Sequence, residues 1–191
     1  MLNLILYGIL DYYGIQLLYY WFHRWMHHSS SGFLYKIHYL GHHKKDFPIN
    51  KIVKMEYSSN SEKGNGGWFE TGGEIAFGIP IMMMIIISYK LFSFSNFIIF
   101  NIALGYNIGI GEFLHSSYHL FSNARNHPEW LWLHNKISKY GWFKQLQLLH
   151  FIHHSYKTAN FGFFDMTMDK IFGTYNETIP IYLQYKLDKI N

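Results

Sequence analysis

Apolar and polar residues follow one another along the chain in long blocks. Residues 1–22 are apolar or aromatic apart from Asn3, Asp11 and Gln16, and residues 74–111 form a second apolar block. Polar sequence separates the two blocks and also follows the second. About 20 apolar residues are enough for a helix to cross the hydrocarbon core of a bilayer. The first block therefore predicts a spanning helix.

The second apolar block is too long for one spanning helix. Tyr89 and Lys90 interrupt it near its middle. We predict a hairpin of two spanning helices at about 74–89 and 91–111, with a re-entrant pair of the same length as the alternative.

The positive charges indicate which side the polar regions occupy. Lysine and arginine gather in residues 23–73 and 112–191, apart from Lys90 at the predicted hairpin turn. Segments rich in these residues usually stay on the cytoplasmic side of a membrane. Both polar regions are therefore expected to form a helical cap on the cytosolic face. The predicted fold class is all-α, an integral membrane protein with about three transmembrane helices.

Composition agrees with this pattern. Hydrophobic residues make up 49% of the chain and charged residues 15%, and this charged share is well below that of a usual soluble domain. A length of 191 residues suits a single domain, residues 1–191. The formal charge of +4, without a run of basic residues, argues against nucleic-acid binding.

Most of the histidines fall into four clusters within the polar regions. Eleven of the thirteen lie in HRWMHH, HYLGHH, HSSYH and HFIHH. In the last cluster, His150, His153 and His154 share a sector of roughly 100° on a helix, which suits a claw of imidazoles around a metal. His127 and His134 stand alone and are not expected to be ligands. The clustered histidines are His23, His27, His28, His38, His42, His43, His115, His119, His150, His153 and His154.

The ligand types narrow the choice of metal. The chain has no cysteine, which excludes thiolate and disulfide chemistry. The clustered histidines outnumber the ligands that one first-row ion can use, so two ions are expected. Imidazole binds both zinc and iron. An apolar substrate with unactivated C–H bonds favours a redox metal with oxygen, and the HExxH motif of many zinc hydrolases is absent.

The motifs HRWMHH, FLYKIHYLGHH, HSSYH and HFIHH, followed by NFGFFDMTMDKIFGTY, resemble the fatty acid hydroxylase and sterol desaturase superfamily. The resemblance extends from about Tyr19 to Tyr175. It implies an integral membrane enzyme of the endoplasmic reticulum or the bacterial inner membrane. A histidine-bound di-iron centre on the cytosolic face would use dioxygen as co-substrate to hydroxylate or desaturate a fatty acyl, sphingolipid or sterol substrate. Zinc is expected to be able to replace iron in purified protein.

By this resemblance the eleven clustered histidines are metal ligands, with the choice between His27 and His28 open. The second cluster departs from the family pattern, because three residues instead of two separate His38 from His42. On a continuous α-helix His43 lies about 140° from His38. One of these two histidines is therefore expected to need a helix break to reach the metal.

Residues after the last cluster are expected to support it. Asn160 and Gly162 predict a turn that positions the cluster, with Asn160 as a hydrogen-bond partner of a ligand. Asp165 and Asp169 either orient imidazoles in the same way or cap a helix.

The chain lacks the HPGG motif of a fused cytochrome b5 domain. Electrons are therefore expected from a separate donor of the cytochrome b5 or ferredoxin type with its reductase.

The alternatives to an oxygen-dependent enzyme are a non-catalytic membrane protein that binds or transports metal, and a family member that has lost catalysis. Transport predicts ionisable groups along a path through the spanning helices, where Asp11 is the one carboxylate well inside a predicted span.

Overall fold

The computed structural model describes residues 2–47, 72–119 and 128–181. The regular elements within these residues are all helical, which confirms the predicted fold class at the level of secondary structure. In chain order they are α1 (Leu2–Met26), η1 (Ser29–Ser31), α2 (Phe33–Tyr35), η2 (Lys36–Asp46), α5 (Gly72–Leu91), α6 (Phe94–His119), α7 (Pro128–Ile137), α8 (Gly141–Ser155) and α9 (Thr167–Ile171).

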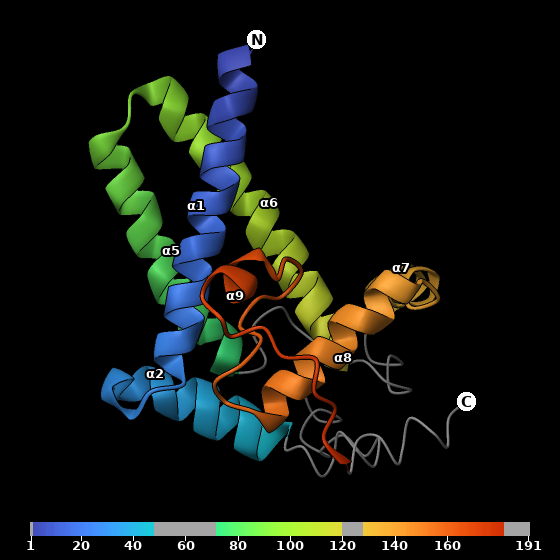
Figure 1. Cartoon of the computed structure of the whole chain (residues 1–191). Coiled ribbons are helices and arrows are strands. Elements are labelled where there is room, and N and C mark those ends of the chain that lie inside the picture. The colour runs from blue at the N-terminus through green and yellow to red at the C-terminus, as the bar shows by residue number, and fades with distance from the viewer. Residues whose placement is uncertain (1, 48–71, 120–127, 182–191) are drawn as a thin grey trace.

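Three long helices form the upper part of the molecule in Figure 1. The helix α1 packs against α6, and α5 packs against α6 and η2. The turn between α5 and α6 lies at the same end as the N-terminus, whereas η2, α8 and α9 lie towards the other end. The elements rich in histidine therefore lie together at the end away from the hairpin turn.

The second apolar block forms a helical hairpin as predicted, with Phe92 and Ser93 between its two helices. Its second helix is longer than predicted, because α6 continues past residue 111 to His119. No proline follows Gly111 within this helix, so nothing in the local sequence stops it. The third histidine cluster therefore lies on the last turns of α6 and not in a separate polar cap.

Membrane crossing is supported most directly for one of these helices. Among the described residues, α6 is the helix that is long and apolar enough to span a bilayer. The apolar part of α5, Gly78–Leu91, is shorter. Spanning by α1 and α5 stays a prediction.

Apolar side chains from all three long helices meet in one core. Ile15 of α1, Met84 of α5 and Leu104 of α6 are buried against one another. Beside them, the buried Gln16 side chain donates a hydrogen bond to Oδ1 of Asn107, which joins α1 to α6. A polar bond between two buried amides is costly to break, so it holds the two helices in a defined register.

The loop between α8 and α9 packs against the lower parts of α1 and α6. Tyr12 of α1 donates a hydrogen bond of 3.0 Å to Asp165. Tyr118 of α6 donates one of 2.7 Å to the carbonyl of Phe163. The side chain of Phe163 is itself buried against Met26 at the end of α1. The loop therefore links the long helices to the histidine-bearing elements.

Candidate metal centre

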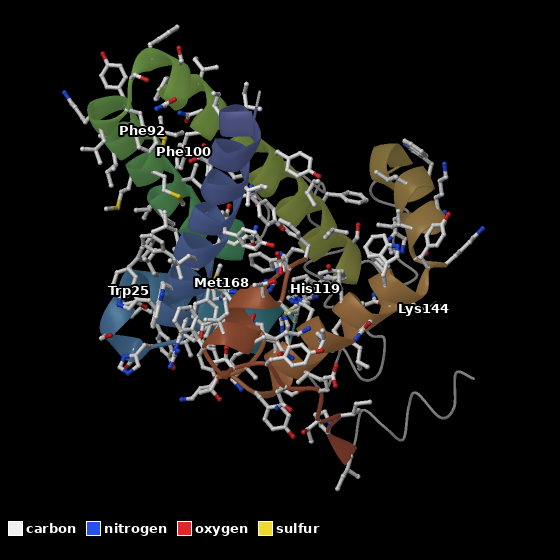
Figure 2. The ribbon with its side chains drawn as sticks, turned by 45° about the horizontal axis from the view of Figure 1, so that its top comes forward. Trp25, Phe92, Phe100, His119, Lys144 and Met168 are labelled. Carbon is white, nitrogen blue, oxygen red and sulfur yellow. The ribbon has the colours of Figure 1, made fainter. Side chains whose placement is uncertain are left out.

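The four histidine clusters come together at one end of the molecule. They lie on the last turns of α1, on η2, on the last turns of α6 and on α8. In Figure 2, His119 lies near α8 and α9, while Phe100 of the same helix α6 lies towards the hairpin turn. Ten of the eleven predicted ligands are buried: His23, His27, His38, His42, His43, His115, His119, His150, His153 and His154.

Nine of these histidines form two groups, in each of which the ring nitrogens lie within 4.8 Å of one another. The five-histidine group consists of His23, His27, His38, His43 and His153. The four-histidine group consists of His42, His119, His150 and His154.

His115 adjoins the four-histidine group, although it does not belong to either set. Its Nε2 atom lies 3.2 Å from Nε2 of His42. The ring centroids of His115 and His150 are 4.9 Å apart. A small movement of one ring would therefore let His115 act as a further ligand.

His28 lies outside both groups, which selects His27 from the open pair. The His28 side chain is exposed, and its Nδ1 atom is 2.8 Å from Oγ of Ser30. His27 follows His23 by four residues and so shares its helix face. His28 follows by five residues and has an extended backbone, with φ −104° and ψ 133°, so it lies outside that face.

In two pairs of consecutive histidines, one member belongs to each group. His43 and His153 belong to the five-histidine group, whereas His42 and His154 belong to the four-histidine group. The ring centroids of His43 and His154 are 4.0 Å apart across the boundary. Because successive residues of a helix point in different directions, η2 and α8 each serve both groups, and the groups lie side by side.

The second cluster lies on a π-helix, which overturns the expectation of a helix break. Residues Lys36–Asp46 have π-helical winding, and Phe47 closes it by donating its N–H to the carbonyl of His42, five residues earlier. This wider winding brings residues five apart onto one face. The Nε2 atoms of His38 and His43 therefore lie 3.3 Å apart, and both belong to the same group.

Backbone carbonyls hold three of the imidazoles. Nδ1 of His23 donates to the carbonyl of Phe161 at 2.6 Å, and Nδ1 of His153 donates to that of Ala159 at 2.6 Å. Nδ1 of His154 donates to the carbonyl of Phe47 at 3.2 Å. A carbonyl can only accept, so Nδ1 carries the proton and Nε2 keeps the lone pair for a metal.

Asn160 supports the site without touching an imidazole, so its predicted bond to a ligand is wrong. It has a positive φ of 55°, a conformation that asparagine tolerates better than most residues. Its side-chain amide donates to the carbonyls of Leu149 and Asn176, and its side-chain oxygen accepts from the N–H of Asn176. None of these bonds goes to an imidazole, and together they fix the predicted turn.

The two aspartates also bond to groups other than histidine. Asp165 accepts from the N–H of Thr167 at the start of α9 and from the hydroxyl of Tyr12, while Met166 holds the N-cap position of α9. Asp169 accepts from the N–H groups of Phe161 and Gly162, both at 2.8 Å. Its contact with the ligands is therefore indirect, through the loop that carries the Phe161 carbonyl.

Residue 162 has no room for a side chain, so glycine is required there. A Cβ atom there would collide with the carbonyl oxygen of Asp165 and lie 3.1 Å from a carboxylate oxygen of Asp169. The NFG sequence therefore combines a left-handed turn at Asn160 with a close backbone approach at Gly162.

Burial and crowding keep the imidazoles neutral. Burial is the main cause that lowers the pKa of His38, His42 and His150, and neighbouring histidines lower it further. Burial also lowers the pKa of His153 to about 4. Neutral imidazole is the form that binds a metal.

Ring nitrogens also converge within the four-histidine group. Nε2 of His150 lies 2.9 Å from Nε2 of His119 and 3.1 Å from Nε2 of His154. A neutral imidazole with its proton on Nδ1 has no proton left on Nε2 to share. Nε2 of His153 is buried and has no hydrogen-bond partner among the described residues. Convergent lone pairs of this kind suit two metal ions.

The two isolated histidines of the sequence lie apart from the groups or outside the described residues. His134 lies on α7, packs against Phe143 with ring centroids 5.8 Å apart, and belongs to neither group. His127 lies outside the described residues.

Phe163 and Phe47 are parts of the site that sequence reasoning missed. The Phe163 ring stacks on His23 at a centroid distance of 5.0 Å and also lies 5.0 Å from His115. The Phe47 ring stacks on His119 at 3.9 Å. Both phenylalanines follow histidine motifs closely in the sequence, but an apolar ring carries no signal that separates a wall of a site from ordinary core.

Comparisons of the chain with protein-family models, with curated proteins and with solved structures found no match.

Proposed function

We propose that this chain is a membrane-bound, non-haem di-iron enzyme that uses dioxygen to hydroxylate or desaturate a lipid. The observation that carries the proposal is the pair of buried, all-histidine groups, side by side at the end of an apolar helix bundle. Their nine imidazoles would hold two ions, with His115 as a further ligand close by.

The composition of the groups favours a redox metal. Neither group includes a carboxylate among the residues that the structure describes. Hydrolysis at zinc generally uses a carboxylate as general base near the ligands. A site made of imidazole alone lacks that base and suits iron, although zinc binds the same ligand type.

The surface of the long helices supports a lipid environment. Large apolar side chains are exposed on α1, α5 and α6, among them Leu18, Trp21, Met82, Ile86, Ile98 and Ile102. Such a surface is unfavourable in water and favourable against acyl chains. The histidine groups lie at the end of this apolar surface, where an acyl or sterol substrate can approach from the membrane.

The chain's own residues would prepare the site for oxidation. Activation of dioxygen and attack on an unactivated C–H bond are the chemistry that a bound iron pair supplies. His23, His153 and His154 are oriented through their backbone partners. The rings of Phe163 and Phe47 cover imidazoles of the two groups and exclude water from them.

Electrons would come from a separate cytochrome b5 or ferredoxin with its reductase. Basic side chains are exposed on the elements that carry the histidines, including Arg24, Lys36, Lys44, Lys45 and Lys144. A basic surface suits an acidic donor protein. It also suits the cytosolic face of the endoplasmic reticulum or of a bacterial inner membrane.

Mössbauer spectroscopy of detergent-purified protein, expressed with iron-57, tests the metal centre. We expect about two irons per chain in the wild type, because two groups are present. His153→Ala and His154→Ala each remove a ligand from a different group, so each should weaken one iron site. His28→Ala is the matched control and should keep both irons. One zinc, or no stoichiometric metal under iron-replete anaerobic conditions, would reject the proposal.

Lipid analysis tests the reaction. Cells that express the wild type should contain a hydroxylated or desaturated lipid that is missing from cells expressing the double variant His153→Ala, His154→Ala. Identical lipid profiles, with iron bound and an electron donor supplied, would reject the oxygenase function while leaving the metal site in place.

A further inference from the structure

The loop between α8 and α9 supports one histidine group through its backbone. The carbonyls of Ala159 and Phe161 accept hydrogen bonds from His153 and His23, and both histidines belong to the five-histidine group. The corresponding support of the four-histidine group lies elsewhere in the chain. Its His154 donates to the carbonyl of Phe47 at the end of η2. The two groups therefore have separate backbone supports.

One buried carboxylate, Asp169, bonds to the part of this loop that carries the Phe161 carbonyl. Oδ1 of Asp169 accepts from the N–H of Phe161 at 2.8 Å and from the hydroxyl of Thr174 at 2.7 Å. Oδ2 accepts from the N–H of Gly162 at 2.8 Å. Asp169 is 0% exposed. Phe161 is thus fixed on both sides, with its N–H on Asp169 and its carbonyl on His23.

We propose that Asp169 is a positioning residue for the five-histidine group and not for the four-histidine group. Its carboxylate holds the loop whose carbonyls set the tautomer and the ring orientation of His23 and His153. This inference rests on the metal-binding part of the proposed function, and it adds that the two metal sites respond differently to one residue.

The bonding requires a group that only accepts. In Asp169→Asn one oxygen becomes an NH₂ group, which donates. Whichever way the amide turns, it confronts the N–H of Phe161 or of Gly162 with another donor. A buried N–H without an acceptor is unfavourable, so the loop should move and its carbonyls should leave His23 and His153.

Cobalt(II) titration of the full-length, metal-free protein in detergent tests this inference. We expect the wild type to bind about two equivalents, one per group. In Asp169→Asn one equivalent should bind about 10- to 100-fold more weakly, the usual effect of losing the partners that orient ligands, while the other keeps its affinity. The visible spectrum of the bound cobalt identifies which site has changed, by comparison with His23→Ala for the five-histidine group and His119→Ala for the four-histidine group.

Asp165→Asn is the matched control. It makes the same chemical change four residues away, but Asp165 bonds to the N–H of Thr167 and the hydroxyl of Tyr12. Neither partner lies in the part of the loop that carries the two carbonyls. Both cobalt affinities should therefore stay at the wild-type values.

A milder variant keeps the test valid if Asp169→Asn fails to fold. Thr174→Val removes the hydroxyl bond to Asp169 and preserves side-chain shape, so it should weaken the same site by a smaller factor. Thr174→Ser restores the hydroxyl and should restore the affinity. Tyr20→Phe is a further control, because the hydroxyls of Tyr20 and Thr174 are 3.1 Å apart. This change should leave both sites unaltered if the effect passes through Asp169.

The outcomes separate this inference from the proposed function. If Asp169→Asn binds both equivalents as the wild type does, or loses both with its helix content intact, the positioning role is rejected. Unchanged binding by Thr174→Val rejects it in the same way when Asp169→Asn cannot be prepared. A wild type that binds no cobalt rejects the metal centre as well. Absence of lipid oxidation by iron-loaded protein bears on the proposed function alone.

Discussion

Acid should destabilise the metal-free protein, because the folded chain keeps its buried histidines neutral. Burial lowers the pKa of His153 to about 4 from an ordinary value of 6.5. The unfolded chain therefore binds this proton first as the pH falls. The stability that depends on neutral His153 is complete above about pH 6.5, decreases between about pH 6.5 and 4, and does not decrease further below that range.

The magnitude follows from the two pKa values. At about 1.4 kcal/mol per pKa unit, the difference between 6.5 and about 4 corresponds to about 3 kcal/mol for His153 alone. For a chain of this size, about 1 kcal/mol moves the melting temperature by roughly 2–4 °C. His153 should therefore lower the melting temperature by roughly 6–12 °C between neutral and acidic buffer. The other histidines of η2 and α8 act in the same direction, since burial lowers the pKa of His38, His42, His43, His150 and His154.

Circular dichroism melting of chelator-treated protein, at about pH 7.5 and about pH 4.5 in the same detergent, measures this effect. His153→Gln removes one titrating group and should reduce the pH dependence by the amount attributed to His153. The matched control is His28→Gln, which makes the same change at an exposed histidine outside both groups. Equal melting temperatures at the two pH values, or an unchanged pH dependence in His153→Gln, would refute the reasoning.

Three further tests address individual parts of the site. His27→Ala should remove metal from the five-histidine group, whereas His28→Ala should not; elemental analysis of both decides whether the exposed His28 has been assigned correctly. Leu40 is 45% exposed, and its deletion leaves two residues between His38 and His42, the spacing that suits an α-helix. We therefore expect α-helical winding and unchanged metal content in this variant. Loss of metal would show that the π-helix itself is required. Gly162→Ala should cost about 1–3 kcal/mol, the usual effect of forcing extra volume into a packed site, and equal melting temperatures would contradict the steric argument.

The sequence predicted which elements and histidines form the site better than it predicted how the histidines divide between the two groups. Apolar blocks and histidine spacing were sufficient to place the helical hairpin and to nominate ten histidines that prove to be buried together. They did not reveal that His42 and His43 serve different groups. That division depends on which distant side chains face each of them, and local spacing contains no information about such packing.

The second cluster shows where a local rule failed. The 140° separation of His38 and His43 assumed α-helical winding, but the observed winding makes five-residue spacing equivalent to the shorter spacing of the family pattern. The supports of the imidazoles were also missed, because they are backbone carbonyls at Phe47, Ala159 and Phe161. Every residue has a backbone carbonyl, so a sequence cannot indicate which carbonyl will accept a hydrogen bond from an imidazole.

The position of α8 has a consequence for how the centre is assembled during synthesis. His153 belongs to one group, and His150 and His154 supply half of the other. A ribosome releases α1, η2 and α6 well before α8, so the earlier histidines wait without their final neighbours. Neither group is complete until α8 has emerged and docked. On the proposed function, metal insertion should therefore be a late step in biogenesis, and a chain truncated before α8 should lack both complete groups.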